Sequence, residues 1–122
     1  MSWHHKIDVA NRLVRVRVDG RLTDADLIEG DTALRNDPEF DPAYYQLLDL
    51  TEADGSDITA AGIQALASLP PLFTSSARRA LVVRSNLGFG MGRMFELLRG
   101  GKSGEFRVFR NLEEACDWLD LG

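Results

Sequence analysis

The first apolar positions of the chain follow the two-residue period of half-buried strands. Apolar and polar residues alternate from Trp3 to Val9 and again from Val14 to Val18, with a turn between the two runs. This alternation predicts two strands joined in a hairpin, each with one face on the core. Thr23 and Asp26 then resemble a capping box, with Asp in place of the usual Glu, so a helix is predicted to follow.

A short apolar run next marks the central strand. Leu47, Leu48 and Leu50 lie close enough together to be buried on both faces, as in the middle of a parallel sheet. Polar residues 51–59 follow as a loop, and helical spacing begins at residues 63–67. Ligands and partners of open parallel sheets gather at the carboxyl ends of the strands, so this loop is predicted to be the functional edge.

Two further strand and helix pairs are predicted in the second half of the chain. Residues 80–83 and 106–109 are apolar strands, and the helices after them begin at Ser85 or Asn86 and at Asn111. The apolar stripes of these two helices are expected to face the core, and they consist of Met91, Met94, Phe95, Leu98, Leu112, Ala115, Cys116 and Leu119.

These elements predict an α/β fold. An N-terminal hairpin and four strand-helix units should form a mainly parallel sheet packed by helices. All 122 residues are assigned to a single domain, 1–122, because the sequence shows no linker, low-complexity run or repeat. A chain of this length buries roughly two thirds of its unfolded surface, which is enough for a core.

Composition excludes several classes of function. The net charge of -5 argues against sequence-independent binding to nucleic acid, which needs a basic surface. The single cysteine, Cys116, allows neither an internal disulfide nor a multi-cysteine metal site. No run approaches the roughly 18 apolar residues of a membrane span, and a cytoplasmic location is expected.

The sequence offers little for catalysis. His4 and His5 point to opposite faces of the first strand and cannot jointly hold a metal. The glycines of residues 88–92 lack the Lys-Ser/Thr of a P-loop, and no Ser-His or Cys-His pair is indicated. We therefore expect a non-enzymatic protein without metal or cofactor.

Asp49 lies within the apolar central strand. An unpaired buried carboxylate is costly, so Asp49 is predicted to be structural. Its expected partners are backbone N–H groups of the next turn or an arginine.

The order of several short motifs resembles a known family. The sequence reads D-L-T at a strand end, D-I-T-A-A-G-I-x-A-L at a helix start, then R-R-A-L-V-V, G-F-G-M-G-R-M-F-E and V-F-R-N-L-E-E-A-x-x-W-L. This order is similar to that of the SpoIIAA-like family of small bacterial STAS domains, over nearly the whole chain. The resemblance implies the STAS fold. It also implies either an anti-sigma-factor antagonist, switched by phosphorylation of a serine, or a looser group compared with Sec14-type lipid carriers.

The antagonist function meets a difficulty at its phosphorylation site. The resemblance places Asp57 on the family's aspartate and Ile58 where the phosphorylated serine would stand, and isoleucine cannot accept a phosphate. Ser56 and Thr59 flank this position. Thr59 stands directly before an apolar helical run, so it is predicted to be the N-cap rather than a switch.

Two functions of different classes remain. The first is a non-catalytic interaction domain that binds a protein partner through the loop residues Asp54, Ser56, Asp57, Ile58 and Thr59. The alternative is a small carrier of an apolar ligand or lipid, or a peripheral membrane protein, with an apolar site made by Leu72, Phe73, Phe89, Met91, Met94 and Phe95. The glycines at 88, 90 and 92 would let the start of this helix open. The sequence is also compatible with a homodimer.

Overall fold

The protein forms one mixed sheet covered by helices on both faces. The computed structural model describes residues 2–100 and 104–121. In order along the chain, its elements are β1 (Ser2–Asp8), β2 (Leu13–Arg21), α1 (Asp24–Arg35), β3 (Tyr45–Asp54), α2 (Ala60–Ala67), β4 (Arg78–Val82), α3 (Asn86–Arg99), β5 (Glu105–Phe109) and α4 (Leu112–Trp118). The predicted order of hairpin and strand-helix units is confirmed.

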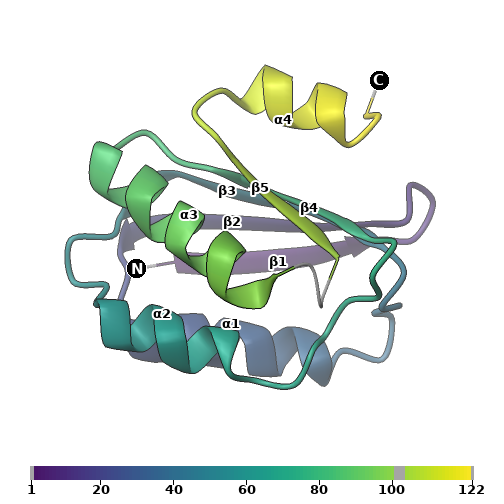
Figure 1. Cartoon of the computed structure of the whole chain (residues 1–122). Coiled ribbons are helices and arrows are strands. Elements are labelled where there is room, and N and C mark those ends of the chain that lie inside the picture. The colour runs from purple at the N-terminus through teal and green to yellow at the C-terminus, as the bar shows by residue number, and fades with distance from the viewer. Residues whose placement is uncertain (1, 101–103, 122) are drawn as a thin grey trace.

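The strands lie in the sheet in the order in which they occur in the chain. β1 and β2 are antiparallel, and β2, β3, β4 and β5 run parallel to one another. Because each parallel crossover steps in the same direction and right-handed crossovers are strongly preferred, the three connecting helices α1, α2 and α3 lie on one face. α4 follows the last strand and covers the opposite face (Figure 1).

The helix ends follow the predicted capping residues. Thr23 and Asp26 form the capping box of α1, and Ser85 caps α3 by accepting a hydrogen bond from the Gly88 N–H. At the other end of α3, Gly100 takes the left-handed conformation with φ of 58°. Asn111 caps α4 in the same way as Ser85 caps α3. Local sequence signals therefore determine where most of these helices begin.

The apolar residues form two clusters, one on each face of the sheet. The larger cluster fills the space between the sheet and α1, α2 and α3, and it includes Val14, Val18, Ile63 and Phe95. The smaller cluster lies under α4 and includes Leu47, Val82 and Ala115. Cys116 packs at the edge of the smaller cluster, as its predicted core position requires.

The predicted loop at 51–59 is partly wrong, because β3 continues to Asp54. β2 is long enough to pair with this extension, so that Glu52 and Asp54 are aligned with Asp19 and Arg21 after an irregularity in the register. The actual loop is residues 55–59. Leu48 and Leu50 are only partly buried, which matters for the site described below.

Two predicted core positions are exposed. Leu98 and Leu112 are 47% and 43% accessible, respectively. In α3 the buried positions are instead Gly92, Phe95 and Arg99. Arg99 occupies the buried end of the stripe because its guanidinium reaches the carbonyl oxygens at the end of α2. Periodicity alone could not predict that an arginine would displace a leucine there.

Acidic conditions are expected to destabilise the fold through carboxylates that accept hydrogen bonds. The pKa values of four of them lie below the ordinary 3.8, chiefly because Asn11, Thr59, His5 and Ser56 donate to Asp8, Asp24, Asp37 and Asp54, respectively. A depressed folded-state pKa gives stability that is present above the unfolded pKa and is lost as the pH falls through the folded value. We expect urea midpoints to be level near neutral pH and to fall below about pH 4. Asp24→Asn should make this decline less steep. A wild-type urea midpoint that stays constant down to pH 2.5 would contradict the expected loss of stability in acid.

Candidate functional site

A cavity of about 210 Å³ lies between the sheet and the layer formed by α1, α2 and α3. Its lining is mainly apolar and includes Leu48 from β3, Leu66 from α2 and Leu81 from β4. Glycines of two helices, Gly30 and Gly92, also line it. A cavity with a mainly apolar lining and a few polar groups is the usual form of a small-molecule site.

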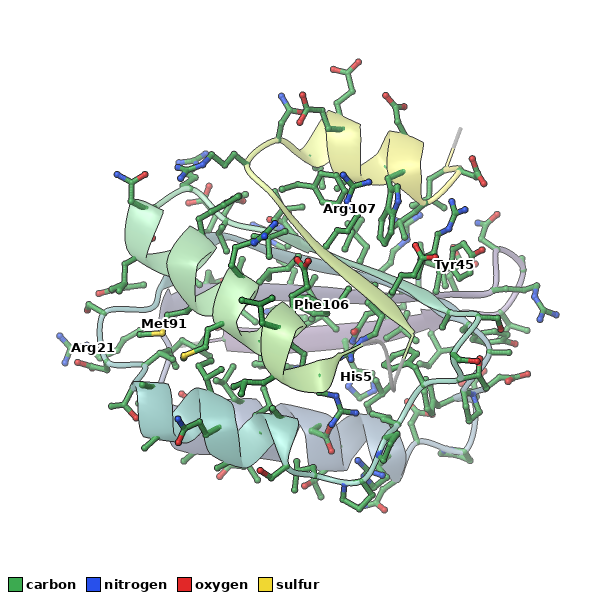
Figure 2. The ribbon with its side chains drawn as sticks, in the orientation of Figure 1. His5, Arg21, Tyr45, Met91, Phe106 and Arg107 are labelled. Carbon is green, nitrogen blue, oxygen red and sulfur yellow. The ribbon has the colours of Figure 1, made fainter. Side chains whose placement is uncertain are left out.

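The predicted apolar residues are divided between this cavity and the surrounding core. Leu72, Met91 and Phe95 line the cavity, and Met91 lies on the side of α3 that faces α2 (Figure 2). Phe73 is buried and packs edge-on against Phe40, with ring centres 5.2 Å apart. Met94 and Phe89 pack at the border of the core, outside the cavity lining.

The most polar part of the cavity lies across β3, β4 and β5. Gln46, Arg79 and Phe106 are register neighbours on these strands, and all three line the cavity. The Nε of Arg79 donates to the Gln46 side-chain oxygen at 3.0 Å. Its guanidinium lies over the rings of Phe73, Phe95 and Phe106, at 4.5, 5.8 and 5.3 Å from their centres. The cation is therefore held in place chiefly by aromatic faces.

A second arginine reaches the same cavity from the end of α3. Arg99 is only 8% exposed, and its terminal nitrogen donates to the carbonyl oxygens of Ala67 and Leu69 at 2.8 and 3.0 Å. These carbonyls lie at the C-terminal end of α2, where a cation is favourable. Arg99 lies within 6.0 Å of the Phe95 ring, which it shares with Arg79.

Burial acts on both cations, and each is also repelled by a neighbouring arginine, Arg79 by Arg99 and Arg99 by Arg35. Burial lowers the pKa of Arg79 to about 9, and the positive charge of Arg99 adds to this effect. Burial likewise lowers the pKa of Arg99, while the charge of Asp31 opposes the change. Both side chains are protonated at neutral pH. The cavity is thus an apolar space with a positively charged wall.

Trp3 forms another part of the lining. Its indole ring lies directly on α1 at Gly30, where a Cβ atom would come 2.1 Å from a ring carbon. This close packing explains why a glycine, which weakens an isolated helix, stands inside α1. The Trp3 indole N–H is buried and has no hydrogen-bond partner among residues 2–100 and 104–121. His5, on the same strand, pairs with Asp37 at 2.8 Å and also lines the cavity.

The predicted partner-binding residues surround the loop after β3. Asp54, Ser56, Asp57 and Thr59 are exposed, and Asp57 pairs with Arg21 at 3.2 Å. Ile58, in contrast, is only 8% exposed and belongs to the larger core cluster.

Thr59 is the N-cap of α2, as predicted. Its hydroxyl accepts a hydrogen bond from the Gly62 N–H at 3.0 Å and donates to Asp24 at 2.6 Å. The Thr59 backbone N–H also donates to Asp24, at 3.0 Å. The same carboxylate therefore joins the starts of α1 and α2.

The carboxylate of Asp49 finds its hydrogen-bond donors within the same strand. It accepts hydrogen bonds from the backbone N–H and the hydroxyl of Thr51, at 3.1 and 2.7 Å. The prediction of a backbone donor is correct, but the donor is two residues away in β3 rather than in the next turn. No arginine of the described residues forms an ion pair with Asp49.

Within residues 2–100 and 104–121, no group of three His, Cys, Asp or Glu side chains could hold a metal ion. Over the same residues, no helix combines the length and apolar character needed to cross a membrane.

Comparison of the sequence finds no match. The chain matches no family model, and no curated protein matches it. Comparison of the structure does find a match, to the crystal structure of an uncharacterized DUF3478-family protein with a SpoIIAA-like fold from Shewanella loihica PV-4. The TM-score is 0.58 at 20% sequence identity, over 97% of this chain and 92% of the other.

The protein has a SpoIIAA-like fold. The expected fold class is thereby confirmed, from the hairpin to the final strand-helix unit. At 20% identity the match carries no information on ligand or partner, so these follow from the chain's own residues.

Proposed function

We propose that this SpoIIAA-like protein is a non-catalytic binding protein that holds a small, largely apolar ligand between its sheet and the α1–α3 layer. The observation that carries this proposal is the cavity of about 210 Å³ with its mainly apolar lining. It favours the carrier that the sequence offered as an alternative.

The size of the cavity argues against an ordinary packing defect. Protein interiors contain few voids larger than a water molecule. The cavity of about 210 Å³ is far larger than that. An engineered apolar cavity of about 150 Å³ binds benzene, whereas drug-sized sites begin near 300 Å³. The ligand should therefore be small.

Filling the cavity should abolish binding without unfolding the protein. Leu48→Phe adds volume at a lining position on β3 and should weaken binding of octanamide, a neutral probe, at least tenfold in calorimetric titration. The matched control is Leu97→Phe on α3, where the side chain is 73% exposed, and it should bind like the wild type.

Two further measurements complete this test. Native mass spectrometry of protein purified from cells should show a retained ligand in the wild type and less of it in Leu48→Phe. Failure of octanamide, octanoate and octylamine all to bind the wild type would refute the carrier proposal.

A protein-interaction domain is the second candidate. The exposed residues Asp54, at the end of β3, and Ser56 and Asp57, in the loop after it, lie at the carboxyl edge of the parallel strands. Phosphorylation is not part of this proposal, because buried Ile58 stands at the acceptor position and the Thr59 hydroxyl is engaged by Asp24.

A further inference from the structure

We propose that the ligand is a small amphiphile with one anionic head group, of the medium-chain carboxylate type, and that Arg79 binds this head group inside the cavity. This inference rests on the proposed binding function and specifies the chemistry of its ligand.

The first argument is charge. Arg79 and Arg99 both line the cavity, and no carboxylate of the described residues lies within ion-pair distance of either. The nearby Asp31 is engaged with Arg35 at 3.0 Å. Neither the half-buried Arg79 nor the buried Arg99 has an ion-pair partner among the described residues, although Asp31 also lines the cavity, so an anion that enters beside them would offset part of the cost of holding these charges away from water. A neutral hydrocarbon would be bound by an apolar lining without either arginine.

The second argument is the free hydrogen-bonding capacity of Arg79. Its only hydrogen bond among the described residues is from Nε to Gln46, so its two terminal nitrogens have no protein acceptor there. A planar guanidinium presents such nitrogens as a fork that matches a carboxylate. The rings of Phe73, Phe95 and Phe106 fix the orientation of this fork. The binding group is thus already ordered before the ligand arrives.

The third argument is the kind of polar atom left unsatisfied. Within the described residues, the buried side-chain nitrogen and oxygen atoms that lack a partner are the Nε1 of Trp3 and the Nε of Arg99. Both are donors, and both belong to residues that line the cavity. The cavity therefore offers donors and positive charge in excess of acceptors, which is complementary to an anion.

The shape of the lining indicates where the apolar part of the ligand lies. Arg79, Leu81 and Val83 are alternate residues along and just after β4, and all of them line the cavity. They span four residue steps, or about 13 Å of extended chain. A single alkyl chain could follow this row away from Arg79, past Leu81 and toward Val83. A lipid with two long chains exceeds the volume of about 210 Å³.

The test compares three probes that differ mainly in their head group: octanoate, octanamide and octylamine. Each is titrated calorimetrically into wild-type protein, Arg79→Gln and Arg107→Gln. Arg107 is an exposed arginine of β5 on the α4 side of the sheet (Figure 2), so its variant controls for the loss of one positive charge. Circular dichroism checks that both variants are folded.

The wild type should bind octanoate at least about tenfold more tightly than octanamide, and octylamine most weakly. Arg79→Gln should reduce the octanoate preference to about twofold while keeping octanamide binding, and Arg107→Gln should keep the full preference. The wild-type series needs no variant, so the proposal can be judged even if Arg79→Gln does not fold.

Each other outcome has a defined meaning. Equal wild-type affinity for octanoate and octanamide would overturn the anionic head group and leave the apolar binding function standing. Equal loss of preference in both variants would overturn the assignment to Arg79. Absence of binding by all three probes would overturn the binding function itself, and the head group with it.

Discussion

Replacing Phe95 with alanine is expected to lower the free energy of unfolding by about 3–5 kcal/mol, the usual cost of removing a buried phenylalanine. Phe95 is 7% exposed and meets Phe106 edge-on, with ring centres 4.8 Å apart. Its ring is also the surface that Arg79 and Arg99 share. Its removal would enlarge the cavity and take an aromatic partner from both cations. Urea denaturation followed by circular dichroism measures the change.

Phe89→Ala is the matched control on the same helix. Phe89 is partly buried, lies outside the cavity lining and contacts the guanidinium of Arg110 at 4.5 Å from its ring centre. Its loss should cost about 1–2 kcal/mol, because less apolar area leaves the core. Similar losses in the two variants would show that Phe95 has no special place in the core.

Gly62→Ala is expected to destabilise the protein by about 2–3 kcal/mol, although alanine normally strengthens a helix. A Cβ at position 62 would come 2.1 Å from the Asp24 carboxylate carbon. That carboxylate accepts both hydrogen bonds from Thr59, so pushing it away would break the junction between α1 and α2. The urea midpoint should fall, and the part of the pH dependence of stability that is due to Asp24 should become smaller.

Gly90→Ala should raise the stability of the protein, whereas Gly62→Ala should lower it. Gly90 is exposed within α3, and a Cβ there would meet no atom within 4 Å. The substitution should therefore raise stability by up to about 1 kcal/mol through helix propensity alone. It should also slow hydrogen exchange at the start of α3. Destabilisation by Gly90→Ala would mean that this segment needs a backbone that alanine disfavours.

Much of the fold could be predicted because its signals are local. Thr23 with Asp26, Thr59, Ser85 and Asn111 each identified the start of a helix from two or three neighbouring residues. The resemblance found in the motif order agrees with the SpoIIAA-like fold found by structural comparison.

The site could be predicted only in part because its determinants lie far apart in the sequence. Leu72, Met91 and Phe95 were identified as a candidate apolar site, but nothing near Arg79 or Arg99 indicates that either guanidinium is buried. Their burial depends on three aromatic rings and on carbonyls at the end of α2. The R-R pair at 78–79 and the arginine that follows an apolar stripe in α3 are the only sequence signals of these cations. A buried arginine cannot be told from an exposed one without the tertiary structure.

The sequential order of the strands has a consequence for synthesis. Each strand pairs with its neighbour in the chain, so no later strand has to be inserted between two that are already paired. The sheet can therefore grow in one direction as the chain leaves the ribosome. Until β5 has been made, however, β4 is the growing edge, and its residues Ala80, Leu81 and Val82 are almost wholly buried in the finished protein. An apolar edge strand readily pairs with other chains, so the nascent protein is most prone to aggregation in the interval between β4 and β5.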